Sequence, residues 1–446
     1  MKKTRLIAAS ISVAAALAFS GCTTNSQTTE PTVKVENKAE KILASYAKIA
    51  QTNYNDALED AKKLQIAVDK FVTSPSEKTL EEAKNAWVAS RESYGQTEIF
   101  RLSNGPIDAE EGWVAETYGA LEGQINAWPL DENMIDYTID AEGKRTSGNI
   151  IDTAGNFNPG GEDSTSVDVS KITVDAITAL NENGGEANVA TGYHAIEFLL
   201  WGQDQDYSNF VKDAITHGPL TAGQRPLSDF TTDKNAQRRL NYLKAATDKI
   251  VSDLEIVAGA WNDGGLYKDA FLGKLSGENS SKNIPSQTAL KQIIAGMGVF
   301  IKSELANERI AVAVLTPSEE DEHSCFSDNT HRDIVQNYQG FKNALTASYM
   351  GKSYGVSLLD AVPSEQKAKI ETLMSSIESK IKSIDEVAKT KEHFDYQIQP
   401  DNPQAKVIVK LKNEMRKLGD AMVDVAIANG ISLSTDDVTD PEETKL

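Results

Sequence analysis

A histidine and a glutamate three residues apart, His194 and Glu197, are the pair in this sequence best suited to chemistry. On a helix, residues three apart lie on one face and one turn from each other, so both side chains can point at a single ion. A neutral imidazole together with a carboxylate suits iron, zinc or manganese, whereas a calcium site is more often built from oxygen alone. The pair therefore predicts a site for a metal ion.

The residues that follow this pair are strongly apolar and include Ile196, Leu199 and Leu200. An unpaired His and Glu would be costly to bury in such a helix, so they must either hold an ion or bond to each other. The spacing alone is weak evidence, because with five His in the chain one His-x-x-Glu arises easily by chance. A hydrogen-bonded pair with a purely structural role is the alternative.

Further ligands have to come from other helices, because two protein ligands do not complete a metal site. Glu98 stands in a partly apolar turn, and Asp108 lies in the first turn of the next predicted helix. We expect both to contribute carboxylates to the ion. For each residue alone, a surface carboxylate or a partner of a helix N-terminus is the ordinary interpretation.

A second unusual run, residues 319–333, contains His323, His331 and Cys325 in a segment of low hydrophobicity. No pair in it has the short Cys or His spacing of a zinc site, so the metal signal is weak. Cys325 with either histidine would be a candidate nucleophile. An ordered loop that leads into a helix capped by Asp328 or Thr330 is the alternative that we favour.

The elements that position these residues are mostly helices, because apolar residues recur at spacings of three and four and period-two alternation is scarce. The predicted helices lie at about residues 36–74, 76–104, 106–129, 171–181, 187–202, 233–261, 286–315, 331–350, 364–391 and 403–429, with loops at 138–170 and 262–285. The pattern predicts an all-α protein of two helical bundles.

Glycine and proline cluster between residues 203 and 232, which places the break between the two bundles there. We expect a first domain over residues 36–225, which contains His194, a second over 226–432, and an acidic tail over 433–446. The two halves show no clean sequence repeat, so an internal duplication is left open.

The N-terminus has the pattern of an export signal. Lys2, Lys3 and Arg5 precede an apolar run that is too short for a membrane span, and small residues stand before Cys22. We expect a signal peptide over residues 1–21, lipidation of Cys22, and a polar tether over 22–35. The protein would then be a periplasmic lipoprotein anchored to the outer membrane; simple secretion with Cys22 as a free thiol is the alternative.

The charge balance excludes one class of partner. The 446 residues include 66 Asp and Glu against 45 Lys and Arg, for a net charge of −21. Removal of residues 1–21 leaves 42 basic residues and a net charge of −24. Such a field repels nucleic acid and attracts cations, although much of it serves solubility alone.

Four segments, taken together, resemble the imelysin family and specifically its iron-regulated protein A-like branch. They are Gly192–Gly202, Phe100–Asp108, Glu304–Arg309 and Glu322–His331. The resemblance covers nearly the whole chain after the signal peptide. It implies two helical-bundle domains, export or lipid anchoring, and a Gly-x-His-x-x-Glu site near the domain interface. In this chain the site would consist of Gly192, His194 and Glu197 with Glu98, and the segments add Arg101, Glu304, Arg309, His323 and Cys325 as candidate site residues.

These observations lead to a lipid-anchored periplasmic metal-binding protein associated with iron uptake. The expected cofactor is a divalent or trivalent metal ion, with iron favoured over zinc or copper, held as a bare ion or as a chelate such as haem. Iron-transport or redox proteins are the expected protein partners.

The first alternative to this function is an imelysin-type metallopeptidase in which the same residues hold zinc and Glu98 activates water. The chain lacks the His-Glu-x-x-His run that places a general base beside two zinc ligands. We therefore favour a metal-binding function over a catalytic one. A surface interaction protein whose site is structural is the third candidate.

Overall fold

The computed structural model describes residues 32–140, 142–204, 222–315 and 322–441. The predicted signal peptide, Cys22 and most of the predicted tether lie outside these residues, as does the end of the predicted acidic tail. The first helix already begins at Thr32, inside the predicted tether. None of the described helices is both long enough and apolar enough to cross a bilayer.

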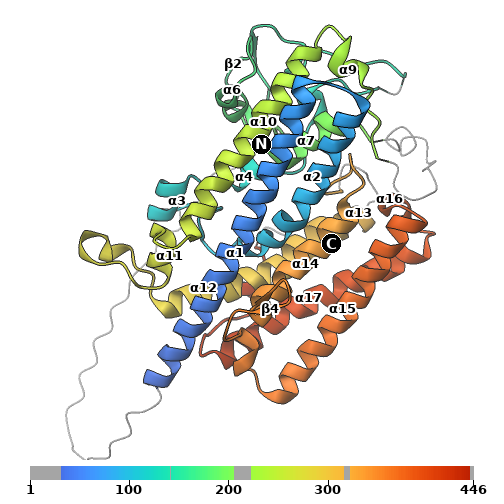
Figure 1. Cartoon of the computed structure of the whole chain (residues 1–446). Coiled ribbons are helices and arrows are strands. Elements are labelled where there is room, and N and C mark those ends of the chain that lie inside the picture. Colours follow the sequence, from blue (N-terminus) through green and yellow to red (C-terminus); the bar gives the residue numbers. More distant parts are fainter. Residues whose placement is uncertain (1–31, 141, 205–221, 316–321, 442–446) are drawn as a thin grey trace, which may run out of the picture.

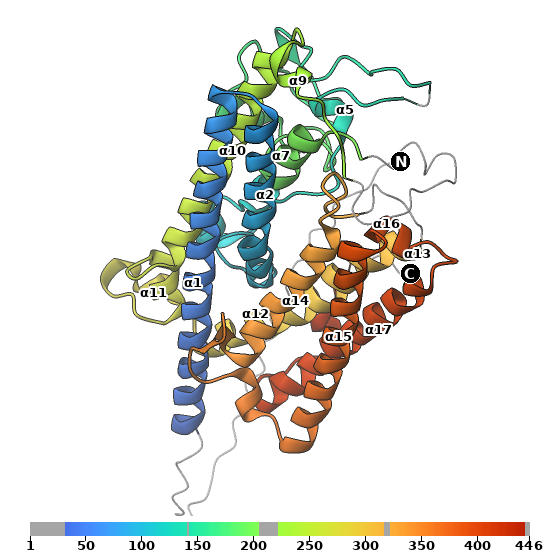
Figure 2. The ribbon, with the colours of Figure 1, turned by 45° about the vertical axis from the view of Figure 1, so that its right-hand side comes forward.

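Long helices dominate the fold, which confirms the all-α prediction (Figure 1). A first group consists of α1 (Thr32–Thr73), α2 (Glu77–Thr97), α7 (Gly192–Trp201) and α10 (Ala236–Trp261). A second group consists of α12 (Ser286–Val299), η3 (Phe300–Ala311), α13 (Val312–Leu315), α14 (Thr330–Thr346), α15 (Ser364–Thr390) and α17 (Pro403–Ala428). Figure 2 shows the second group, yellow to red, beside the lower half of the first.

Short elements connect these helices. In the first half they are η1 (Glu98–Phe100), α3 (Gly112–Tyr118), α4 (Glu122–Ile125), α5 (Glu132–Ile135), β1 (Asn156–Phe157), β2 (Val167–Asp168), α6 (Val174–Leu180) and α9 (Ser228–Thr231). In the second half they are α11 (Leu266–Phe271), η2 (Gly277–Lys282), β3 (Ser348–Tyr349), β4 (Lys352–Ser353), η5 (Leu358–Ala361), α16 (Phe394–Gln397) and η6 (Asp436–Val438). The strands form two antiparallel hairpins, with Asn156 opposite Asp168 and Ser348 opposite Ser353.

Local sequence explains where the long helices begin and end. Ser76 caps α2 through a capping box with Thr79, and Asn402 caps α17, whose first residue is Pro403. The predicted helix over 106–129 is wrong, because the chain there forms only α3 and α4. Gly119, which ends α3, has a φ of 84°, and such a left-handed residue terminates a helix.

The predicted helix over 286–315 is continuous, but its middle part, η3, is a π-helix. In a π-helix each turn is wider, and hydrogen bonds join residues five apart. Glu304 and Arg309 therefore lie one turn apart, and Arg309 Nη2 donates to Glu304 Oε1 over 2.8 Å.

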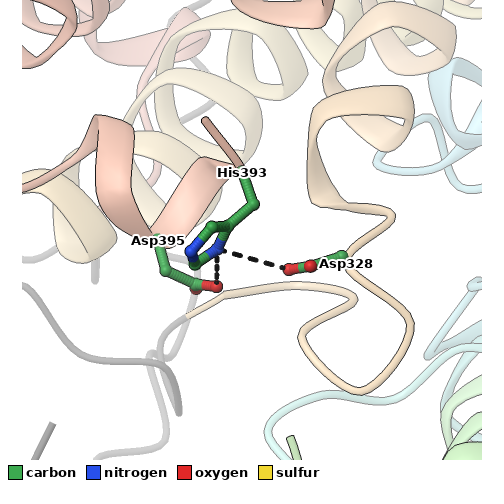
Figure 3. A group of neighbouring side chains, drawn as sticks. All are labelled: Asp328, His393 and Asp395. Carbon is green, nitrogen blue, oxygen red and sulfur yellow. Dashed lines mark hydrogen bonds and ion pairs between the residues drawn. The ribbon is translucent and has the colours of Figure 1, made fainter. Parts of the chain in front are cut away.

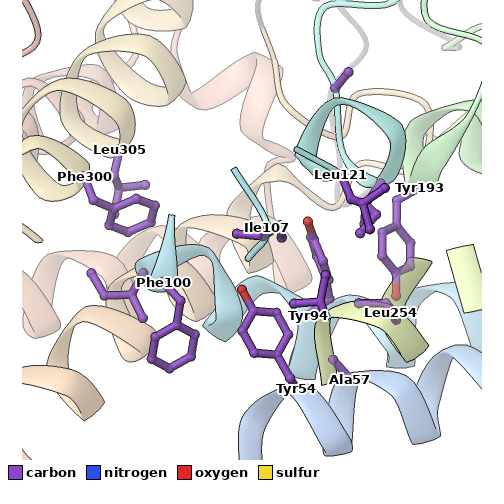
Figure 4. Close-up of a cluster of buried hydrophobic side chains, with 14 of the residues drawn as sticks. Tyr54, Ala57, Tyr94, Phe100, Ile107, Leu121, Tyr193, Leu254, Phe300 and Leu305 are labelled. Carbon is purple, nitrogen blue, oxygen red and sulfur yellow. The ribbon is translucent and has the colours of Figure 1, made fainter. Parts of the chain in front are cut away.

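The domain boundary that we expect between residues 225 and 226 stays a prediction. The first long helix after it, α10, packs along α1 and α7, and α12 also contacts α1. A single apolar core runs through both groups of helices, and Figure 4 shows Tyr54, Tyr94 and Tyr193 of the first group in it together with Phe300 and Leu305 of η3.

The two groups of helices meet where α2 and α14 cross closely, with a glycine on each helix at the crossing. A Cβ atom on Gly340 would lie 2.4 Å from the carbonyl oxygen of Gln96, and one on Gly95 would lie 2.8 Å from Gln336 Cβ. Around them, Asn337 Nδ2 donates to the carbonyl of Gly95 over 3.0 Å. Two backbones can approach this closely only where side chains are absent, so the crossing requires glycine on both helices.

We predict that Gly340→Ala lowers the free energy of unfolding by about 1–3 kcal/mol, because backbone lies where the new methyl group would sit. Denaturant unfolding monitored by circular dichroism measures the change. Gly259→Ala is the matched control, since Gly259 lies in α10 with open space at its Cβ position. We expect that control to be neutral or slightly stabilising. Equal destabilisation by both substitutions would contradict the role of the crossing.

Candidate metal centre

The two sequence segments that hold the candidate histidines lie against each other in the folded chain. The rings of His194 on α7 and His323, in the loop before α14, meet edge to face with centroids 4.6 Å apart. One turn further along α7, the rings of Phe198 and Phe326 are 5.1 Å apart. The loop over residues 322–329, which we call the motif loop, therefore covers the helix that carries His194.

Helix α7 can begin where it does only because its first residue is glycine. Gly192 has a φ of 87°, and a Cβ atom there would lie 2.6 Å from the carbonyl oxygen of Ile125. Any side chain would be both strained and in collision with the backbone. Gly192 is thus a positioning residue that sets the place of His194 two residues later.

His194 and Glu197 are fully buried and bonded to each other. His194 Nδ1 lies 2.9 Å from Glu197 Oε2, and both side chains have no exposed surface. The other carboxylate oxygen, Glu197 Oε1, accepts from the backbone N–H of Ser327 over 3.0 Å and from its hydroxyl over 2.6 Å. The second imidazole nitrogen, His194 Nε2, is buried and has no hydrogen-bond partner among the described residues.

Burial dominates the protonation of this pair. It lowers the pKa of His194 well below its usual value, and the neighbouring His323 adds to that effect. Burial also raises the pKa of the Glu197 carboxyl to about 8, against the two hydrogen bonds from Ser327. The imidazole is therefore neutral at physiological pH, as a metal ligand must be.

His323 is held in the same way by a second carboxylate. Its Nδ1 lies 2.8 Å from Asp333 Oδ2, while Asp333 Oδ1 accepts from Arg91 Nη2 over 3.1 Å. The Ser324 hydroxyl also donates to Asp333. Burial would raise the pKa of Asp333, but Arg91 and His323 hold it well below its usual range. The ionised carboxylate fixes the His323 proton on Nδ1, so Nε2 presents its lone pair.

Asn126 links this histidine to Glu98. Its amide Nδ2 donates to Glu98 Oε1 over 2.8 Å and lies 3.4 Å from His323 Nε2, while Arg91 Nη1 donates to its oxygen over 2.5 Å. The side-chain amide of Asn126 thus connects Glu98 to the His323 ring.

Glu98 itself is paired with arginine. Its Oε2 accepts from Arg309 Nη2 over 2.7 Å and from Arg101 Nη1 over 3.2 Å. Burial raises the pKa of Glu98, but Arg309 and Arg101 outweigh it and lower the pKa below its usual value. The same two arginines, against burial, lower the pKa of Glu304 to about 2. Both carboxylates are ionised and bound to guanidinium groups.

Asp108 binds the backbone of the residues that precede it in the chain. One oxygen accepts a hydrogen bond from the N–H of Leu102, and the other is buried and has no hydrogen-bond partner in the part of the chain that the structure describes. Among the described residues, the only three His, Cys, Asp or Glu side chains with donor atoms all within 4.8 Å are Asp328, His393 and Asp395. The structure therefore brings His194 and Glu197 together but does not gather Glu98 and Asp108 around them, and metal binding by these four residues stays a prediction.

Cys325 lies in the apolar core, with 1% of its surface exposed, and forms no disulfide within the described residues, which do not include Cys22. The motif loop is ordered as we favoured, although the residue that precedes α14 is Asn329 rather than Asp328 or Thr330. Thr330 instead accepts from the backbone N–H of Ser324 over 3.0 Å and so closes the loop.

A cavity of about 350 Å³ opens beside His323. Trp128, one of its lining residues, contacts both histidines, with centroids 5.0 Å from His194 and 6.5 Å from His323. The charged lining residues are Arg101, Arg309, Glu122, Glu182, Glu186, Glu304 and Glu308. Burial and the nearby Glu98 and Glu304 raise the pKa of Glu122 to about 7, against the opposing effect of Arg101. Five carboxyl groups against two guanidinium groups favour the entry of a cation.

Sequence reasoning did not find the residues that orient the second histidine. Nothing in the spacing of Asp333 and Arg91 predicts a pair, because they are 242 positions apart. Asn126 lies in the segment predicted to be a helix and carried no signal. The placement of His323 beside His194 likewise depends on tertiary structure.

Comparison with known proteins defines the class to which this chain belongs. The family model described as Imelysin matches residues 50–422, so the chain is a member of the imelysin family. An iron-regulated protein A precursor from Parabacteroides distasonis ATCC 8503 has a similar structure, with a TM-score of 0.51, 19% identity, and coverage of 91% of this chain and 96% of that one. An imelysin-like protein from Psychrobacter arcticum 273-4 matches with a TM-score of 0.52, 10% identity, and coverage of 89% and 97%.

No curated protein matches the chain in sequence. The family, the all-α fold and the predicted resemblance are thereby confirmed, while the structural neighbours, at these identities, support the fold alone.

We predict that Asp333→Asn lowers the free energy of unfolding by about 3–5 kcal/mol near neutral pH, because Arg91 is then left as a buried charge without its partner. The difference from wild type should shrink as the pH falls below about 4, where the carboxyl becomes protonated in the unfolded wild-type chain. Urea unfolding between pH 3 and 7 measures both effects. Glu365→Gln, which breaks an exposed pair with Lys369, is the control and should change stability by less than about 0.5 kcal/mol.

Proposed function

We propose that this imelysin-family protein binds a metal ion through Nε2 of His194 and Nε2 of His323. The observation that carries the proposal is the shared arrangement of the two imidazoles. Each uses Nδ1 to contact a buried carboxylate, Glu197 or Asp333, and each directs Nε2 away from that carboxylate. A carboxylate behind each ligating imidazole is the usual outer shell of a histidine metal site.

In this proposal Glu197 orients His194 and does not itself bind the ion. Its carboxylate already receives three hydrogen bonds, two of them from Ser327, when Nδ1 of His194 is the donor. Glu98, which two arginines neutralise, supports the site through Asn126. Two imidazoles leave positions for water or for a chelating ligand, and the cavity beside His323 provides the room.

Iron is the metal that we favour. One structural neighbour is named an iron-regulated protein, and neutral imidazoles bind iron as well as zinc or copper. We also propose export, with a lipid anchor at Cys22 in the periplasm, on the basis of the N-terminal sequence pattern. The protein would then hold iron outside the cytoplasm for a transport or redox partner.

Metal binding by variants tests the site. We expect His194→Gln and His323→Gln each to weaken the binding of Fe²⁺, measured anaerobically, and of Zn²⁺ at this site by at least about a hundredfold. Tyr193→Phe changes a buried ring beside His194 without altering a metal donor, so it should retain binding. Equal metal content in wild type and both histidine variants would refute the proposal.

The same samples can be incubated with casein. Metal-dependent cleavage that disappears in His194→Gln would replace a binding role with peptidase activity.

A pH dependence follows from the Glu197 carboxyl, whose pKa burial raises to about 8. When Glu197 is protonated, its O–H donates to His194 Nδ1 and the imidazole proton lies on Nε2, which then cannot bind metal. Binding below pH 8 must therefore release a proton, so affinity should rise up to tenfold per pH unit and level off above about 8. Dissociation constants for Zn²⁺ between pH 6 and 8.5 measure this slope. Glu197→Gln should remove it, and an unchanged slope in that variant would contradict the assignment.

A further inference from the structure

A second group of buried donor atoms lies where the motif loop meets α16 (Figure 3). His393 precedes α16 and Asp395 lies in its first turn, while Asp328 belongs to the motif loop. His393 Nδ1 lies 2.7 Å from Asp395 Oδ2 and 3.8 Å from Asp328 Oδ1. The side chains of all three residues are fully buried.

A third carboxylate, Glu322, adjoins this group. Glu322 has no exposed surface, and the described residues offer its carboxyl group no hydrogen-bond partner other than the carboxyl of Asp395. Burial, then the adjacent carboxyl of Asp395 and the charge of Asp328, raise the pKa of Glu322 well above its usual range. In the described part of the chain, no Lys or Arg forms an ion pair with Glu322. Three buried carboxyl groups and one imidazole therefore lie close together, and burying several carboxylates beside one another is costly.

We infer that Asp328, His393 and Asp395 form a second metal site for a divalent first-row transition metal ion, with the carboxyl of Glu322 beside them. A metal about 2.1 Å from each ligand holds neighbouring donors about 3.0 Å apart in an octahedron and about 3.4 Å apart in a tetrahedron. The observed separations of 2.7 and 3.8 Å from His393 Nδ1 lie on either side of these values. Shifts of less than about 1 Å in side chains would admit the ion.

The donor types narrow the identity of the ion. One imidazole and two carboxylates, with a third carboxyl nearby, suit Mn²⁺, Fe²⁺ or Zn²⁺, whereas Ca²⁺ prefers a shell of oxygen and Cu⁺ prefers sulfur. A dipositive ion would also offset the mutual repulsion of the three neighbouring carboxyl groups. The competing interpretation is a metal-free cluster in which protons on the carboxyl groups perform this task.

This second site is separate from the one under the proposed function. No ligand is shared, but Glu322 and His323 are consecutive residues of the motif loop that belong to different sites. Metal occupancy of the two sites can therefore be removed independently, and each proposal can fail without the other.

The test uses the purified protein after treatment with a chelator, Zn²⁺ as the probe, and equilibrium dialysis followed by metal analysis. The double variant His194→Gln/His323→Gln removes the first site and should still bind one equivalent of zinc. Adding Asp395→Asn to it should weaken that binding at least a hundredfold. Adding Asp253→Asn instead, which alters a buried aspartate paired with Lys249 on α10, should leave it unchanged.

A folded double variant that binds no zinc would overturn the second site, as would retention of the equivalent after Asp395→Asn. If Asp395→Asn does not fold by circular dichroism, Glu322→Gln replaces it and should weaken binding at least tenfold; unchanged affinity would likewise overturn the inference. Zinc that is lost with His194→Gln but not with Asp395→Asn would support only the proposed function. The reverse pattern would support only the second site.

Discussion

The buried carboxylate of Asp333 is the contact on which the candidate site and the junction of the two helix groups both depend. It accepts hydrogen bonds from Arg91 of α2 and from His323 and Ser324 of the motif loop, while it belongs to α14 itself. A guanidinium group that is 1% exposed can be accommodated only beside an ionised partner. The ion pair therefore fixes the position of the motif loop over α7 and, through it, the tautomer of His323.

The distribution of buried charge separates three kinds of carboxylate in this acidic protein. Glu98 and Glu304 are neutralised by Arg101 and Arg309, and the wider turn of the π-helix η3 brings Arg309 beside Glu304. Glu197 and Asp333 face imidazoles and orient them. Glu322 faces other carboxyl groups. Only Glu322 forms no ion pair with a basic side chain of the described residues, which is why it points to a cation.

The motif loop connects these environments because it is short and completely buried. His323 and Ser327 turn toward α7, where they meet His194 and Glu197, whereas Glu322 and Asp328 turn toward α16. The hydrogen bond from Ser324 N–H to Thr330 closes the loop onto the start of α14. A metal ion bound on either side would thus meet a loop that is already ordered by contacts with three helices.

The sequence by itself determined most of the long helices, the family and the pairing of His194 with Glu197, because all three depend on local spacing. Helix caps and apolar periodicity act within a few turns, and residues three apart share one face of a helix. The sequence-based prediction failed over 106–129, where glycines with positive φ interrupt an apolar pattern. Only the tertiary structure decided which charge meets which carboxylate. The partner of Glu98, Arg309, is 211 positions away, and His393 is equally unpredictable as a neighbour of Asp328. The apolar periodicity of a helix predicts which of its faces is buried. Which other element packs against that face depends on how the apolar surfaces of the helices fit together.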